Sequence, residues 1–241
     1  MIPFLGPFDS FPAVETALDE PGGLLAAGGG LSVRRLVDAY GKGIFPWFNE
    51  GDPILWWCPD PRMVLRPREI HLSRTLRRRL RRADFTVTAD TAFADVLSAC
   101  AAPRAGESGT WLVPAMRRAY RALHAAGHAH SIEVWMDGTL AGGIYGVALG
   151  RMFFGESMFS RRTDGSKIAM AFLSGQLDRW GFPLIDCQLK TAHLASLGAS
   201  PMPRRAFVRE VATLVGEPGV PGPWVLEKGT CFLFGSDLRN A

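Results

Sequence analysis

The chain has 241 residues, a net charge of +4, and 47% hydrophobic against 21% charged residues, the balance of an ordinary soluble globular protein. No apolar run approaches the roughly 20 residues of a membrane span, and the N-terminus lacks the basic and apolar regions of a signal peptide. We therefore expect a cytoplasmic protein that does not enter a membrane, built as one large domain or as a small domain attached to a medium one.

The first sixty residues are rich in Gly, Pro and Trp. Ser32 is suited to cap a short helix that Gly43 would end. Prolines forbid regular helix in the next segment, and the aromatic side chains between residues 44 and 57 are too many to leave in water. We expect residues 1–62 to form a small, irregular N-terminal domain packed on the remainder.

Residues 63–241 alternate between helical and strand patterns and are expected to form one larger domain. The patterns predict an antiparallel meander of three strands, then a crossover helix and a further strand. This order indicates an α+β fold with a mixed sheet, compatible with the acyltransferase fold of N-acetyltransferases (the GNAT type). Helices are expected over residues 73–83, 91–100, 114–126, 166–180 and 204–215, and strands over 85–88, 130–136, 140–149, 152–159 and 183–187.

A run of arginines marks one predicted helix. Between residues 66 and 82, eight arginines stand against one glutamate, so this segment carries +7 and the rest of the chain −3. Like charges at helical spacing repel, and a phosphate backbone would relieve the repulsion. A solvated basic helix is the alternative, but the lack of interleaved acidic residues favours RNA binding. The arginines that crowd one side are Arg74, Arg77, Arg78, Arg81 and Arg82.

Several aromatic side chains offer candidate stacking faces for unpaired bases, although most single aromatic residues fill protein cores. Trp111 is the best candidate, because it follows a loop expected to lie near the surface. The other candidates are Tyr40, Trp47, Trp56, Trp57 and Tyr120.

Metal and cofactor motifs are weak. His124, His128 and His130 have no nearby Cys or carboxylate that would complete a zinc site, so we expect no metal. The four cysteines form no C-x-x-C pair, and a disulfide framework is not expected. The segment 162–167 keeps the Arg and the first Gly of the turn that cradles coenzyme A phosphates in N-acetyltransferases, but it ends in Lys.

Two predicted strands end in acidic and amide residues. Glu156 lies in one, and Asp186 and Gln188 lie in the other, among apolar neighbours. A carboxylate in such surroundings is either paired with a cation or functional. Two interpretations therefore remain open: a site that handles an amine, and a buried ion pair. Side chains alternate along a strand, so Cys187 is expected to point to the side opposite Asp186 and Gln188. We therefore set aside the hypothesis of a thiol nucleophile assisted by His193.

Eight sequence strings between about residues 11 and 207 resemble, in order, those of the bacterial leucyl/phenylalanyl-tRNA–protein transferases. Cys58 departs from the family, where many relatives have Ser, and Thr191 stands where Asn is expected. The strings are Gly23–Gly29, Gly43–Phe48, Pro53–Trp57, Pro59–Arg62, His128–Trp135, Gly155–Ser160, Ile185–Gln188 and His193–Ala199.

This resemblance implies an aminoacyltransferase with a small N-terminal domain and an acetyltransferase-like catalytic domain. The donor would be Leu- or Phe-tRNA, and the acceptor a protein that begins with Arg or Lys; the product is a degradation signal of the bacterial N-end rule. The donor ester is already activated, so no ATP, metal or other cofactor is expected, and we expect a monomer. The alternatives are a coenzyme A-dependent N-acetyltransferase and a non-catalytic RNA-binding module.

The resemblance also implies roles for single residues. Trp47 and Trp111 would flank the 3′-terminal adenosine. We assign Asp186 to orienting the acceptor amine and accepting its proton, directly or through Gln188, with Glu156 near the acceptor; a rival mechanism uses the 2′-hydroxyl of that adenosine as the relay. The aminoacyl-adenosine site would further include Tyr40, Tyr120 and Ser160, and its amino acid pocket would be lined or bordered by Phe153, Met158, Phe172, Leu173 and Ile185.

Overall fold

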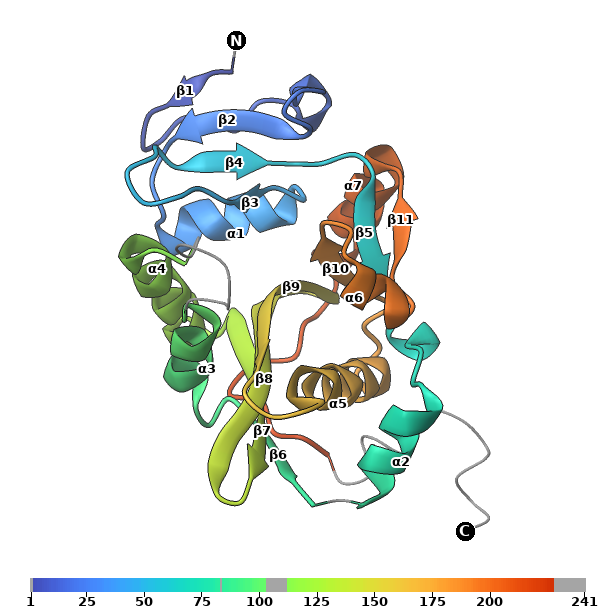
Figure 1. Ribbon diagram of the computed structural model, residues 1–241. Coiled ribbons are helices and arrows are strands. Elements are labelled where there is room, and N and C mark those ends of the chain that lie inside the picture. Colours follow the sequence, from blue (N-terminus) through green and yellow to red (C-terminus); the bar gives the residue numbers. More distant parts are fainter. Residues whose placement is uncertain (1, 83, 103–111, 228–241) are drawn as a thin grey trace.

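A computed structural model describes residues 2–82, 84–102 and 112–227 and contains two β-sheets (Figure 1). The smaller sheet has four strands in the order β1-β2-β4-β3, and the larger has seven in the order β11-β5-β10-β9-β8-β7-β6. The smaller sheet ends with Trp57, and the larger begins with Arg62, so the two sheets use successive parts of the chain.

The smaller sheet is built from very short strands: β1 (Phe4–Leu5), β2 (Leu24–Gly28), β3 (Phe45–Pro46) and β4 (Leu55–Trp57). Strands of this length give no alternating pattern, and the sequence did not predict them. The capped helix is confirmed as α1 (Val33–Gly41), because the Ser32 side chain accepts a hydrogen bond from the Arg35 N–H at 3.2 Å. A 3₁₀ turn spans Val14–Thr16.

The predicted α+β fold with a mixed sheet is confirmed. Strands β7 (Ala129–Met136), β8 (Thr139–Leu149) and β9 (Met152–Ser160) form the antiparallel meander. Helix α5 (Gly165–Arg179) then crosses over to β10 (Leu184–Gln188), which pairs in parallel with β9.

Three further strands complete the larger sheet. At one edge lies β6 (Thr86–Ala89), close to the predicted strand. Beyond β10 lie two strands that the sequence did not predict, β5 (Arg62–Leu65) and β11 (Ser200–Met202), which pair antiparallel with each other. They are four and three residues long, respectively, and each has a proline in it or next to it, so their pattern is weak.

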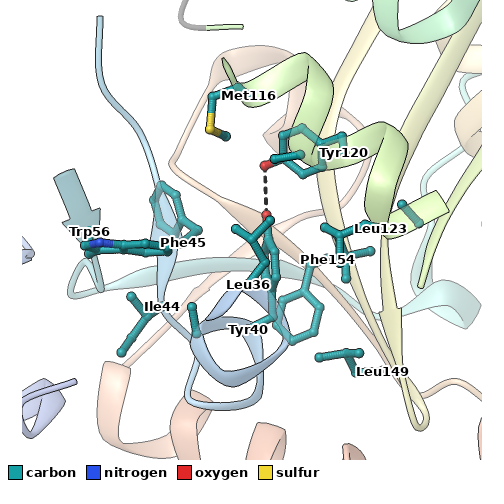
Figure 2. Packing of buried hydrophobic residues seen from close by; sticks show 14 of the residues in the cluster. Leu36, Tyr40, Ile44, Phe45, Trp56, Met116, Tyr120, Leu123, Leu149 and Phe154 are labelled. Carbon is teal, nitrogen blue, oxygen red and sulfur yellow. Dashed lines mark hydrogen bonds between the residues drawn. The ribbon is translucent and has the colours of Figure 1, made fainter. Parts of the chain in front are cut away.

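Helices cover both faces of the meander (Figure 1). Helices α3 (Phe93–Cys100) and α4 (Pro114–Ala125) lie on one face, and α5 lies on the other beside α2 (Arg74–Arg82). Figure 2 shows α1 meeting α4 on the first face, where the hydroxyls of Tyr40 and Tyr120 bond across the core at 2.8 Å. The remaining elements are a 3₁₀ turn at Pro67–Glu69, α6 (Ala192–Ser196) and α7 (Arg204–Leu214).

Candidate active site

A pocket of about 920 Å³ opens where β9 and β10 part. The two strands pair only as far as Phe154 and Asp186, while β9 continues alongside β8 to Ser160. Both sheets contribute to the walls, since Phe45 and Pro46 of β3 line the pocket together with the end of β9. The pocket is lined by Phe45, Pro46, Trp47, Ala99, Cys100, Ala102, the segment 156–161, Ser166, Cys187, Gln188, Leu189, Thr191, His193 and Leu194.

A β-bulge turns Glu156 toward this pocket. The register of β9 on β8 shifts at Glu156, which has no pairing partner of its own. Phe153 and Met158 consequently pack in the same hydrophobic cluster, on the α5 face, although they are five residues apart. In a regular strand an odd separation places side chains on opposite faces. The extra residue therefore changes the direction of every later side chain of β9.

The Glu156 carboxyl group sits in a buried, hydrogen-bonded position. One of its oxygens accepts a bond from the Tyr120 hydroxyl at 2.5 Å, and the other accepts from the Gln188 side-chain amide at 2.8 Å. Burial raises the pKa of Glu156 from 4.5 to about 7, an effect that the Tyr120 and Tyr40 hydroxyls partly oppose. A carboxyl group whose pKa lies near neutrality is suited to accept a proton.

Gln188 occupies the end of β10 in a strained backbone conformation. Its φ of 60° lies in the left-handed region, which a residue with a side chain seldom adopts. The register against β5 shifts between Asp186 and Gln188, so a second bulge marks this strand end. The Gln188 backbone N–H donates to Asp186 Oδ1 at 2.8 Å, and its side chain lines the pocket beside Glu156.

Asp186 is buried behind the pocket rather than exposed in it. Both of its oxygens are held by Arg62, with Nε to Oδ1 at 2.8 Å and Nη2 to Oδ2 at 2.6 Å, and both side chains are 0% exposed. The buried ion pair that the sequence left open is therefore present, in addition to the contact with Gln188. Direct proton acceptance by Asp186 does not fit this geometry, but an action through Gln188 does.

The aromatic candidates fall into two groups. Trp47 is 43% exposed, lines the pocket and stacks at a tilt against Trp57, with ring centroids 5.6 Å apart. Tyr40 and Tyr120 are fully buried, so the expectation that their rings offer stacking faces needs revision: the hydroxyls of both act on Glu156 instead. Trp111 lies outside the described residues.

The residues that the resemblance places around the amino acid pocket also fall into groups. Met158 and Ser160 line the cavity. Phe153, Leu173 and Ile185 are at most 1% exposed and form the packed layer behind Met158 rather than the wall. Phe172 is half-buried and packs edge-on against Phe85, with centroids 6.0 Å apart.

Cys187 also lines the pocket, which corrects the expectation that it points away from this region. The pocket reaches around the end of β10, and the bulge there lets Cys187 and Gln188 both border it. Burial raises the pKa of the Cys187 thiol far above its usual value, with Asp186 adding to the effect. The thiolate is disfavoured, so the geometry gives no support to a Cys187 nucleophile.

The turn that leads into α5 differs from a coenzyme A cradle. Ser160 Oγ accepts a hydrogen bond from the Ser166 N–H at 2.7 Å. This side chain therefore already uses one of the N–H groups with which the helix N-terminus would hold a phosphate.

The arginine helix α2 lies apart from the pocket, next to α5 (Figure 1). Arg74, Arg78, Arg81 and Arg82 are exposed, and within the described part of the chain none of them has an ion-pair partner. Arg77 is half-buried and donates from Nε to the Leu72 carbonyl at 2.9 Å. The helix thus presents several unneutralised cations, while its leucines face the core.

Two of the three histidines, His124 and His130, have partners within the protein. His124 stacks on Phe93 with centroids 4.1 Å apart, and His130 bonds to Asp90 at 2.7 Å. Among the residues that the structure describes, no group of His, Cys, Asp and Glu is arranged to hold a metal ion. Nor does any helix in this part of the chain have both the length and the apolar character needed to cross a membrane.

Sequence reasoning missed the residues that support the site from behind. Arg62 binds Asp186, and the buried rings of Phe45 and Phe207 pack against the Arg62 guanidinium. The only signal in the sequence is Arg62 itself, a charged residue between two prolines and an apolar run. Its partner lies 124 residues further along the chain, which no local pattern reveals.

The fold and the site first define a class: an α+β protein with a mixed sheet and a hydrogen-bonded acid–amide pair, Glu156 and Gln188, in a pocket lined by two sheets. A family model described as leucyl/phenylalanyl-tRNA protein transferase matches residues 64–212, and a model of the N-terminal domain of these proteins matches residues 29–60. The chain therefore belongs to the leucyl/phenylalanyl-tRNA protein transferase family.

Relatives with this description are similar over most of their length. The protein from Thiobacillus denitrificans is 59% identical over 217 residues, which cover 90% of this chain and 95% of the relative. That from Nitrosospira multiformis is 60% identical and covers 89% and 93%. Among solved structures, a GCN5-related N-acetyltransferase from Kribbella flavida has a TM-score of 0.37 and 14% identity, covering 67% of this chain and 57% of its own.

Proposed function

We propose that this chain transfers leucine or phenylalanine from a charged tRNA to the N-terminal Arg or Lys of an acceptor protein. The observation that carries the proposal is the family match over residues 29–60 and 64–212. The open pocket with Glu156 and Gln188 at its polar end supports it. The peptide bond formed creates an N-degron, and charged tRNA as the donor makes the cytoplasm the compartment of the reaction.

In the chemical step, the acceptor amine attacks the ester carbonyl carbon. The new C–N bond forms, the bond to the 3′-oxygen of the adenosine breaks, and the amine proton must finally reach that oxygen. Gln188 donates its amide N–H to Glu156, so its carbonyl oxygen is available to accept a bond from the amine. Glu156, with a pKa of about 7, is suited to take the proton and pass it on.

The remaining residues of the site serve binding. Trp47 offers its exposed ring to the terminal adenosine, and Met158 borders the space for the leucine or phenylalanine side chain. Asp186 orients Gln188 from behind, and the exposed arginines of α2 bind the tRNA backbone. We further propose a monomer with two domains that divide near residue 62, where the strands pass from one sheet to the other.

The test is a transfer assay with leucyl-tRNA carrying labelled leucine and two peptides that differ only in beginning with Arg or with Glu. Label on the Arg peptide alone supports the proposal. Acetyl transfer from acetyl coenzyme A in the absence of tRNA would favour an N-acetyltransferase. The bond from the Ser166 N–H to Ser160 argues against this alternative, because it uses an N–H group with which the helix N-terminus would hold a phosphate. Binding of tRNA without any transfer would leave an RNA-binding module.

A further inference from the structure

The Arg62 guanidinium is enclosed by three different parts of the molecule. It lies between the ring of Phe45 in β3, at 4.7 Å, and the ring of Phe207 in α7, at 4.6 Å. Its edge forms the two parallel bonds to Asp186 at the end of β10. Arg62 itself begins β5 and is 0% exposed. One side chain thus contacts the smaller sheet, the larger sheet and α7.

Stability alone does not account for a charge in this position. Transfer of two charged groups from water into the interior costs free energy that their attraction only partly returns, and apolar residues of similar size often serve stability as well or better. Arg62 also keeps one nitrogen, Nη1, buried and without a hydrogen-bond partner among the described residues. Because the burial of this pair costs free energy that apolar side chains would not cost, the pair points to a role in arranging other groups.

The arranged group is Gln188. Arg62 fixes the plane of the Asp186 carboxylate, and the same Oδ1 that accepts from Arg62 Nε also accepts from the Gln188 N–H at 2.8 Å. Gln188 needs this bond, because its φ of 60° is a conformation that a non-glycine residue keeps only when its surroundings impose it. In this conformation its side chain reaches Glu156 at 2.8 Å.

We propose that Arg62 is the positioning residue of the reaction: through Asp186 it holds the strained Gln188 in the pocket. The inference rests on the proposed function. Arg62 therefore sets the position of the acceptor-side amide without lining the pocket itself.

The test compares Arg62→Lys with Arg66→Lys. Lysine keeps the charge but lacks the planar fork that binds both oxygens of a carboxylate. Arg66 makes an exposed ion pair with Glu210, so the same substitution there is a matched control. We expect R62K to lower kcat about 100-fold, the effect of a catalytic group displaced by about 1 Å, with an unchanged KM for leucyl-tRNA. R66K is expected to behave as the wild type, and a wild-type kcat in R62K would overturn the proposal.

A double-mutant cycle tests whether Arg62 affects the reaction through Gln188. If Arg62 acts through Gln188, R62K has little left to remove once Gln188 is replaced, so R62K/Q188A should transfer no more than about 2-fold slower than Q188A. Losses that multiply in the double variant would overturn the proposal. If R62K does not fold, R62M/D186L replaces the pair with apolar residues; it should fold but transfer as slowly as Q188A, and wild-type transfer by it would contradict the inference.

A third measurement does not depend on activity. Hydrogen exchange of the Gln188 backbone amide should become at least about 10-fold faster in R62K or in R62M/D186L and stay unchanged in R66K. Unchanged protection in the Arg62 variants would overturn the positioning role whether or not the wild type transfers leucine. Absence of transfer by the wild type, with faster exchange in R62K, would instead count against the proposed function alone.

Discussion

The pKa of Glu156 shows how the surroundings of a single side chain determine its ionisation. Its carboxyl group faces the hydroxyls of Tyr120 and Tyr40, the Gln188 amide and, further away, the Asp186–Arg62 pair. Because burial has the largest effect, the pKa of Glu156 is raised to about 7. Between pH 4.5 and about 7, the folded protein therefore holds a proton that the unfolded chain has already released.

The stability of the protein should therefore fall as the pH rises through this window. Between pH 4.5 and about 7 the unfolded chain loses the Glu156 proton first, so the folded state is favoured at the acidic end. Relative to Glu156→Gln, which does not titrate, we expect the wild type to lose roughly 2–3 kcal/mol between pH 5 and pH 8. Urea unfolding of both proteins at the two pH values measures this, since other groups cancel. A constant difference would show that the carboxyl group titrates normally.

The buried ion pair gives a second prediction at this scale. Asp186→Ala leaves the Arg62 charge buried without a partner, which should lower the free energy of unfolding by about 3–5 kcal/mol. Glu210→Ala removes an exposed partner of Arg66 and should cost less than about 1 kcal/mol. Denaturant unfolding of the two variants is the measurement, and equal losses would contradict the burial of the pair.

At the scale of elements, sequence patterns succeeded where segments are long. The meander, its crossover helix and the helix that Ser32 caps have enough residues to show a period. Strands β5 and β11 did not, and the bulges at Glu156 and Gln188 depend on pairing with other strands. For that reason, the sequence placed Glu156, Asp186 and Gln188 at the ends of two strands but did not indicate that Asp186 faces away from the pocket.

The packing of α5 on β8 depends on a contact between two glycines. A methyl group on Gly142 would lie 2.5 Å from the backbone of Gly165, where α5 begins. Gly142→Ala should therefore displace the helix start next to the pocket and destabilise the protein by about 1–3 kcal/mol. Gly41→Ala is the control, because it lies in α1 with no atom within 4 Å and should gain about 0.5–1 kcal/mol. Thermal unfolding distinguishes them, and similar effects of both would argue against the close approach.

Helix α2 carries a prediction about binding. Removal of two exposed cations by R78A/R81A should weaken tRNA binding and reduce the slope of log K against log salt by about one per lost phosphate contact. The transfer rate at saturating tRNA should not change, because α2 does not line the pocket. The control is R205A/R209A, which removes two exposed arginines from α7. A salt slope that is the same in both variants would remove α2 from the tRNA site.

At the scale of the whole molecule, the pocket belongs to neither sheet alone. Its walls combine Phe45–Trp47 from the smaller sheet with the bulged ends of β9 and β10 from the larger. A substitution in the smaller sheet should consequently affect a reaction whose polar groups lie entirely in the larger one.

Trp47→Ala tests this expectation. Loss of the stacking ring should raise the KM for leucyl-tRNA about 10-fold, because stacking of a base on an aromatic ring contributes about 1–3 kcal/mol. The matched control is Phe8→Ala, since Phe8 is the more exposed ring, at 91%, and does not line the pocket. Steady-state kinetics with varied tRNA gives the answer; an unchanged KM in the Trp47 variant would separate the smaller sheet from donor binding.

The distance of 124 residues between Arg62 and Asp186 also matters during synthesis. A ribosome delivers the chain from its N-terminus, so the smaller sheet is complete while Arg62 still lacks its carboxylate and the covering ring of Phe207. Arg62 gains its carboxylate only when β10 has been made, and its second covering ring only when α7 has followed. If Arg62 positions Gln188 as proposed, we expect the nascent chain to become competent only late in its translation, once α7, the last helix among the described residues, covers the arginine.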